Sequence, residues 1–186
     1  MTVAGPDGHP RCAWAVSAPE YMSYHDEEWG KPIRDDHGLY ERITLEAFQS
    51  GLSWITILRK RENFRAAFAG FDPQLVAAYG PADFDRLMAD PGIVRNRLKI
   101  NATIANARAL LDLDEGALTK LLWSFAPVDR PAPKTNADVP ATTPESVAMS
   151  KALKKNGFVF IGPTTCYALM QATGIVNDHL AGCISR

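Results

Sequence analysis

The sequence predicts an all-α protein, and three observations carry that prediction. Apolar residues recur at helical spacing over much of the chain, as at Ile57, Phe64 and Phe68. Acids, serine, threonine and proline stand where the apolar patterns begin, and glycines stand where several of them end. Only residues 158–161, between two glycines, have the pattern of a strand.

The expected elements follow from these signals in order. Asp35 or Asp36 caps a first helix that stops at Gly51, and Ser53 caps a second that stops at Gly70. Later helices are expected from 73, over 81–88, 95–113 and 118–125, from 144 to about 155, and from 163 to near 174. Residues 127–144 hold five prolines and few large apolar residues, which predicts a long irregular connection.

Length and composition favour one domain over residues 1–186, with residues 1–10 as a flexible tail. At 46% hydrophobic residues the chain can bury a core, and no apolar run approaches the roughly 18 residues of a membrane span. Three cysteines cannot form a disulfide framework, so we expect a cytoplasmic protein without a membrane partner. We expect a monomer.

Charge is unevenly distributed although the net charge is −1. Residues 20–46 hold eight acids and three bases, whereas residues 58–108 hold nine bases and five acids. Such asymmetry allows one basic face on a neutral protein, as a polyanion binder needs. Solvated helix surfaces explain the same counts.

Two cysteine–histidine pairs stand near opposite ends of the chain. Cys12 and His25 form one pair, and His179 and Cys183, in an H-x3-C spacing, form the other. Two thiolates and two imidazoles are the ligand set of a closed, structural zinc site. Incidental cysteines and surface histidines are the alternative. Cys166, in an apolar stretch, is expected to be a buried thiol.

Residues 86–95 have the pattern of a helix-hairpin-helix, within a motif of about 84–108. Pro91-Gly92 turns between the helices, Ile93 anchors the turn inward, and backbone N–H groups from Gly92 onward face a DNA phosphate. Arg95 and Lys99 add positive charge beside it. A proline–glycine turn between two ordinary helices is the alternative.

Glu46 lies three residues after Ile43 and seven after Leu39, so its carboxylate falls on the apolar stripe of its helix. A buried carboxylate requires a hydrogen-bond or cationic partner. The nearby aromatic residues suit a flat, cationic guest; they are Trp14, Tyr21, Tyr24, Trp29 and Trp54. A helix-end glutamate bonded to backbone, among core aromatics, is the alternative.

Longer strings then resemble the 3-methyladenine DNA glycosylase I family over roughly residues 10 to 184. They are Arg11-Cys12-Ala13-Trp14, Tyr24-His25-Asp26-Glu27-Glu28-Trp29-Gly30, Leu45-Glu46, Ser50-Gly51-Leu52-Ser53-Trp54-Ile55-Thr56-Ile57-Leu58, Lys60-Arg61-Glu62-Asn63-Phe64, Ser150-Lys151-Ala152-Leu153-Lys154-Lys155, Asn177-Asp178-His179 and Gly182-Cys183. The resemblance implies a helix-hairpin-helix DNA glycosylase fold with a structural zinc ion that joins the N- and C-terminal segments. The ligands it implies are Cys12, His25, His179 and Cys183.

The resemblance further implies an enzyme that flips N3-methyladenine out of alkylated double-stranded DNA and hydrolyses its glycosidic bond, with free 3-methyladenine as product. Glu46 and Tyr24 are then the catalytic residues. The residues implied to bind the substrate are Trp54, Tyr21 and Trp14. Leu52, at a Gly-Leu-Ser turn, is expected to fill the gap left by the flipped base, unless it packs under the turn as a core residue.

Asn96 stands where bifunctional members of the superfamily keep a lysine nucleophile, so we expect a monofunctional hydrolase without lyase activity. Lys99, one turn further along, is expected to point at phosphate. Asp112 and Asp114 are more simply solvated acids at a helix end. Two rival functions are a zinc-stapled DNA-binding module without catalysis, which has no need of Glu46, and a metallohydrolase, which needs an open metal position.

Overall fold

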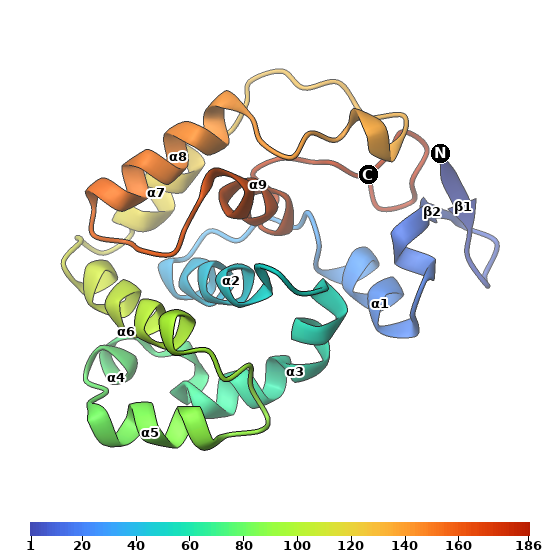
Figure 1. Ribbon diagram of the computed structural model, residues 1–186. Coiled ribbons are helices and arrows are strands. Elements are labelled where there is room, and N and C mark those ends of the chain that lie inside the picture. The colour runs from blue at the N-terminus through green and yellow to red at the C-terminus, as the bar shows by residue number, and fades with distance from the viewer.

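Helix α2 (Asp36–Gln49) lies at the centre of a mostly helical protein, and the other helices surround it (Figure 1). The computed structural model describes residues 1–186. The remaining elements are β1 (Thr2–Ala4), β2 (Pro10–Cys12), η1 (Ala13–Val16), α1 (Pro19–Glu27), α3 (Trp54–Ala67), η2 (Ala69–Phe71), α4 (Pro73–Ala77), α5 (Pro81–Ala89), α6 (Arg97–Leu111), α7 (Ala117–Trp123), η3 (Asn136–Asp138), α8 (Pro144–Lys155) and α9 (Pro163–Ala172).

Local capping signals account for where the helices begin. The Asp35 carboxylate accepts the Gly38 N–H at the start of α2, and Asp72 does the same for two amides of α4. Proline stands in the first turn of α4, α5, α8 and α9, where its missing N–H leaves no hydrogen bond unmade. The expected helices after residue 35 are therefore confirmed, with shifts of a few residues at their ends.

Three segments differ from what the sequence predicts. Helix α1 was not expected, because Ala18 offers it no side-chain cap and its apolar face is weak. Residues 1–10, expected as a tail, include β1, which pairs antiparallel with β2. Residues 158–161 form no strand, because the Asn106 side chain bonds both the N–H and the C=O of Val159, which leaves no edge to pair.

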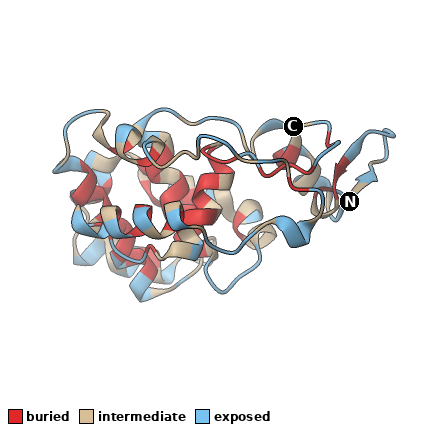
Figure 2. Cartoon of the chain, turned by 90° about the horizontal axis from the view of Figure 1, so that it is seen from above, coloured by how far each residue is buried: buried red, intermediate tan, exposed pale blue.

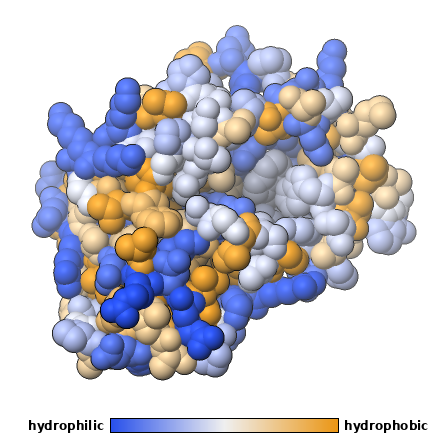
Figure 3. Space-filling model, in the orientation of Figure 1, coloured by the Kyte–Doolittle hydropathy of each residue, from blue (hydrophilic) through white to orange (hydrophobic).

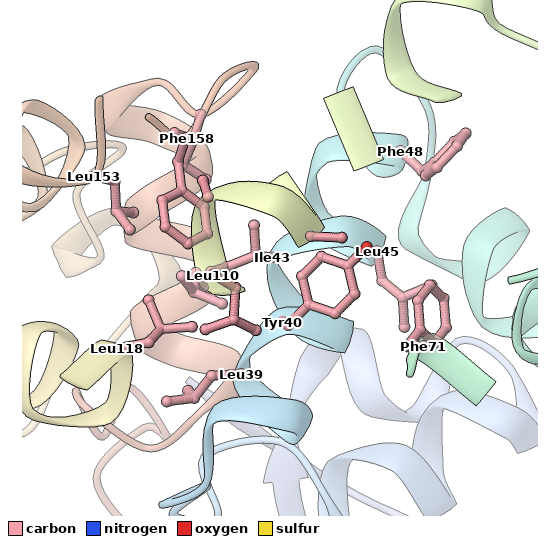
Figure 4. Close-up of a cluster of buried hydrophobic side chains, with 14 of the residues drawn as sticks. Leu39, Tyr40, Ile43, Leu45, Phe48, Phe71, Leu110, Leu118, Leu153 and Phe158 are labelled. Carbon is pink, nitrogen blue, oxygen red and sulfur yellow. The ribbon is translucent and has the colours of Figure 1, made fainter. Parts of the chain in front are cut away.

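The main core is built on α2 because this helix is apolar on nearly every side. Every residue from 39 to 48 except Glu41 is buried. Figure 4 shows α2 side chains between neighbours from both halves of the chain, with Phe71 on one side and Phe158 on the other. The Tyr40 hydroxyl donates to the Thr103 carbonyl 2.9 Å away, so α2 is also tied to α6 by a buried hydrogen bond.

A second, smaller buried cluster joins the two ends of the chain. Cys12, Leu180 and Cys183 pack together, with Trp14 against them. Figure 2 shows buried residues near both termini, apart from the larger buried group inside the helices. None of the helices combines the length and the apolar run that crossing a bilayer requires.

Candidate active site and metal centre

The four cysteine and histidine residues predicted as ligands meet in one place. Cys12, His25, His179 and Cys183 are all buried, and their ligand atoms all lie within 4.8 Å of one another. His25 Nε2 lies 3.1 Å from His179 Nδ1, and the Cys183 sulfur lies 3.4 Å and 3.6 Å from these nitrogens. Such separations suit a tetrahedral cation about 2.0–2.3 Å from each ligand atom.

The ring nitrogens that point away from the cluster have partners that orient both imidazoles. His25 Nδ1 lies 2.7 Å from the Asp26 carboxylate, and His179 Nε2 lies 3.0 Å from the Trp29 carbonyl. Asp26 in turn accepts hydrogen bonds from two nitrogens of Arg11, Nε and Nη2. Carboxylates and carbonyls behind the imidazoles are the usual outer partners of metal ligands. The donor set therefore fits a metal ion.

Burial favours the neutral forms of the cluster side chains. Burial raises the pKa of the Cys12 thiol to about 11 and lowers the pKa of His179 to about 4. A buried thiolate is unfavourable at neutral pH unless a cation neutralises it, and a neutral imidazole is the form that binds metal.

A cavity of about 230 Å³ lies between α1, α2, α3 and α9. Figure 3 shows the hollow right of centre, bordered by side chains of intermediate hydropathy. This volume is below the roughly 300–1,000 Å³ of pockets for drug-sized ligands, so the cavity suits a guest of nucleobase size. Its lining comprises Trp14, Tyr21, Tyr24, Trp29, Glu46, Gln49, Trp54, Ala168 and Gln171.

Glu46 is the charged residue of this pocket, and its carboxylate makes no hydrogen bond or ion pair within the protein. The residue is only 5% exposed, and burial raises the pKa of its carboxyl group to about 7 although Arg42 nearby lowers it. The alternative of a glutamate bonded to backbone does not hold, because no such bond is present. A carboxylate in this position is free to accept a hydrogen bond from a donor, or to pair with a cation, that enters the pocket from outside.

Aromatic rings form the walls around Glu46. The ring centroids of Tyr24 and Trp54 lie 5.4 Å apart, and the planes of the two rings meet at 42°, so their faces converge. The Tyr24 hydroxyl lies 3.4 Å from Arg42, and burial raises the pKa of this phenol, which stays neutral. The Tyr21 hydroxyl accepts the Ile55 N–H at 2.8 Å and so fixes α1 against the start of α3. The Trp54 indole N–H is buried without a partner.

The candidate metal centre and the pocket share a wall. The Trp14 ring packs edge-on against His25 and against Trp29, and Trp29 stacks on His25. His179 packs against Trp29 as well. The aromatic wall of the pocket is therefore held by the imidazoles that would bind the metal.

The helix-hairpin-helix is present as α5, a turn over residues 90–96, and α6. Ile93 is buried, as expected, and the Lys60 ammonium binds the carbonyls of Pro91 and Gly92. The Gly92 N–H is already donated to Asp90, whereas the amides of residues 93–95 have no acceptor in the chain. Arg95 is exposed at the same turn.

Two expected DNA-contacting residues have opposite environments. Leu52 is 40% exposed at the tip of the turn between α2 and α3, so the alternative of a core leucine does not hold. Lys99 is only 6% exposed, and its ammonium binds the carbonyls of Phe48 and Ser50. The expectation that Lys99 points at phosphate is thus wrong, because these carbonyls draw the side chain inward.

Gln49, Ala168 and Gln171 line the pocket but were not identified from the sequence. Gln49 stands three residues after Glu46, and that helical spacing could have indicated it. Ala168 and Gln171 come from α9, more than 110 residues away in the chain, and no local pattern marks them. Asn96 is the N-cap of α6, where its side chain accepts the Lys99 N–H.

A helical protein with a helix-hairpin-helix and an aromatic pocket the size of one base has the features of a DNA glycosylase. The methyladenine glycosylase family matches residues 14–186. DNA-3-methyladenine glycosylase 1 of Escherichia coli (strain K12) is 50% identical over 179 residues, 93% of this chain and 95% of that protein. The chain belongs to the methyladenine glycosylase family.

Solved structures agree with this membership. A crystal structure of 3-methyladenine DNA glycosylase I, 47% identical, matches with a TM-score of 0.89 over 94% of this chain and 98% of that one. A structure of the Staphylococcus aureus enzyme, described as the basis of its 3-methyladenine recognition, is 35% identical and matches with a TM-score of 0.87. It covers 94% of this chain and 95% of that one.

Proposed function

We propose that this protein excises N3-methyladenine from alkylated double-stranded DNA by hydrolysis of the glycosidic bond and leaves an abasic site. The observation that carries the proposal is Glu46, a buried carboxylate without a partner among the converging rings of a base-sized pocket. Methylation at N3 makes adenine cationic, so the modified base is the partner that this carboxylate lacks. Neutral adenine offers no such charge.

The proposed chemistry follows from the charge on the base. The C1′–N9 bond breaks, its electron pair neutralises the leaving base, and the sugar develops oxocarbenium character. Water adds to C1′ and loses one proton. Glu46 accepts a hydrogen bond from the base and stabilises its charge, while Trp54 and Tyr24 hold the flipped ring by stacking. Free 3-methyladenine then leaves as product.

We propose zinc as the metal at the Cys12, His25, His179 and Cys183 cluster, in a structural role. The support is the ligand set, two thiolates and two imidazoles, with outer partners on both rings. Four protein ligands leave no open position for a reacting water, so the metal supplies cross-linking rather than chemistry at C1′. This count argues against a metallohydrolase.

We propose that the enzyme is monofunctional. A lyase needs a free amine at the sugar, whereas Asn96 caps α6 and the Lys99 amine is occupied by two carbonyls. Borohydride reduces a Schiff base to a stable adduct, so trapping is the direct assay. A borohydride-dependent crosslink to DNA that disappears in Lys99→Met would contradict the assignment.

The test of the activity is chemical. The purified protein is incubated with methylated duplex DNA, and the released bases are identified by chromatography. Release of 3-methyladenine, with intact strands, is expected. A protein that binds duplex DNA but releases no base would instead be the rival DNA-binding module. Cytoplasmic location and a monomeric state stay predictions.

A further inference from the structure

Lys99 is a buried cation with no acidic partner, at the junction between α6 and the end of α2. Its ammonium lies 2.7 Å from the Phe48 carbonyl and 2.6 Å from the Ser50 carbonyl, and it forms no ion pair. Burial without a counter-charge lowers the pKa of this lysine. Packing alone would favour an apolar side chain here, so the charge has another use.

The use is visible in the hydrogen bonds at the end of α2. The Ala47 carbonyl accepts the Ser50 N–H, and the Gln49 carbonyl accepts the Leu52 N–H. The Phe48 and Ser50 carbonyls of the same turn accept hydrogen bonds from the Lys99 ammonium instead. A cation is also favoured at the carboxyl end of a helix by the helix dipole. Lys99 thus completes the bonding of this turn.

The far side of the ammonium is covered by the loop between α8 and α9. The Phe160 ring lies with its centre 5.9 Å from Lys99 Nζ. Phe160 has a left-handed backbone (φ 57°), which is rare for a residue with a side chain. The Asn106 bonds to Val159 hold this loop beside α6, and the Ser150 hydroxyl, which donates to the Ile161 carbonyl, ties it to α8 (Figure 1). The lysine is therefore enclosed between carbonyls and an aromatic ring.

The segments that Lys99 connects indicate its role. In the sequence, Glu46 of the pocket precedes the Phe48 and Ser50 carbonyls, and the exposed Leu52 follows them. Lys99 itself belongs to the first turn of α6, directly after the hairpin turn with its free amides and Arg95. One side chain therefore connects the DNA-facing hairpin to the turn that carries Leu52.

We propose that Lys99 is a positioning residue that fixes the Gly51–Leu52–Ser53 turn relative to the hairpin, so that Leu52 enters the duplex when the hairpin engages the DNA backbone. The proposal rests on the proposed function for its duplex substrate. It assigns Lys99 neither a phosphate contact nor a contact with the base. Its effect is confined to steps that need Leu52 in place.

The experiment compares Lys99→Met, which keeps the length and removes the charge, with Lys99→Arg, which keeps the charge and two donors. Lys120→Met is the matched control. Lys120 is exposed on α7. Helix α7 also packs on α2, and Asp36 at the start of α2 accepts a hydrogen bond from α7. Three quantities are measured: excision at saturating enzyme on methylated duplex, binding of free 3-methyladenine by tryptophan fluorescence, and the salt dependence of duplex binding.

The expected result for Lys99→Met is excision about 10- to 100-fold slower at saturation, the scale of a misplaced reacting geometry. The affinity for free 3-methyladenine should stay at the wild-type value. The salt slope, meaning the slope of the logarithm of the duplex-binding constant against the logarithm of the salt concentration, should also be unchanged. Lys99→Arg should recover much of the excision rate. A salt slope reduced by about one would instead indicate a phosphate contact and overturn the proposal. Equal loss of free-base affinity, or failure to fold, would also overturn it and make Lys99 structural.

A second readout does not depend on excision. A duplex with a tetrahydrofuran abasic-site analogue carries 2-aminopurine beside it, and insertion of Leu52 changes the fluorescence. Lys99→Met should bind this duplex yet give the same 2-aminopurine fluorescence as Leu52→Ala. The double variant, Lys99→Met with Leu52→Ala, should give the same fluorescence as either single variant. A wild-type signal in Lys99→Met would overturn the proposal. If the wild-type protein shows insertion but releases no 3-methyladenine, the proposed function fails and the positioning role stands.

Discussion

Glu46 and Lys99 are both buried charged side chains on central helices, but only one of them has partners. Lys99 donates to two carbonyls, whereas Glu46 has no bond within the protein. Neither side chain has a counter-charge that forms an ion pair with it, so burial of the charge costs free energy in both cases. The difference supports the proposed roles, which are positioning within the protein for Lys99 and binding of a guest for Glu46.

We predict that Glu46→Gln stabilises the protein at alkaline pH. The folded-state pKa of about 7 lies above the ordinary value of 4.5, so this group's contribution to stability is full below about pH 4.5 and is lost as the pH rises through 7. Glutamine has no charge to lose. At pH 8 the variant should gain up to about 3 kcal/mol, measured by urea unfolding, and the gain should vanish near pH 4.5.

The same variant should lose at least about 100-fold in excision rate, the scale of losing one electrostatic contact to the reacting group. For the wild-type enzyme, kcat/KM should rise with pH through about 7 as Glu46 ionises, and this limb should be absent in Glu46→Gln. Glu41→Gln is the control, because Glu41 lies on the same helix but pairs with Arg65. Excision by Glu46→Gln at the wild-type rate would refute the pocket assignment.

We predict that Leu52→Ala weakens binding to duplex with an abasic-site analogue by about tenfold, since the wedge that offsets lost base stacking is gone. Affinity for free 3-methyladenine should change little, because Leu52 does not line the pocket. Both affinities are measured by fluorescence titration. Leu75→Ala, an exposed leucine on α4, should change neither. Parallel loss of both affinities in Leu52→Ala would indicate a disturbed pocket.

At the scale of elements, the hairpin exposes backbone amides and Arg95 at its turn, whereas Lys99, in the helix that follows the turn, points into the protein. The turn is fixed from behind by Lys60, which binds two of its carbonyls, and by buried Ile93. The amides of residues 93–95 remain without acceptors in the chain. This arrangement supports phosphate binding by the backbone of the turn together with one exposed guanidinium.

We predict that Arg95→Ala lowers the magnitude of the salt slope of duplex binding by about one, because one phosphate contact is removed. The excision rate at saturating enzyme should stay near that of the wild type. Lys120→Ala removes one charge on α7 and should leave the slope unchanged. A slope unaffected by Arg95→Ala would place the phosphate contacts elsewhere.

At the scale of the whole molecule, the Cys2His2 cluster that could hold a metal ion brings residues 12 and 183 together and supports one wall of the pocket. Cys12 is the last residue of β2, and Cys183 lies near the end of the chain. Trp14 and Trp29 pack on the ligand imidazoles. Loss of the metal should therefore affect both stability and the environment of these rings.

We predict that the wild-type protein binds one equivalent of zinc and that Cys183→Ala binds far less. Loss of a cross-link over a loop of well over 100 residues costs about 5 kcal/mol, which corresponds to a fall in Tm of roughly 10–20 °C for a chain of this size. Tryptophan emission should shift as well. Cys166→Ala is the control, because this buried cysteine lies outside the cluster and the variant should keep its metal. An unchanged Tm in Cys183→Ala would exclude a structural metal.

The helices after residue 35 could be predicted from the sequence, because caps, first-turn prolines and apolar spacing act within a few residues. The four cysteine and histidine residues of the cluster and the aromatic and acidic residues of the pocket could also be predicted, from the long motifs that resemble the family. The folded chain was needed to show that Lys99 turns inward, that residues 158–161 form a loop bonded to Asn106, and that Ala168 and Gln171 complete the pocket. The physical reason is that these depend on contacts between segments 49 or more residues apart, which no local pattern encodes.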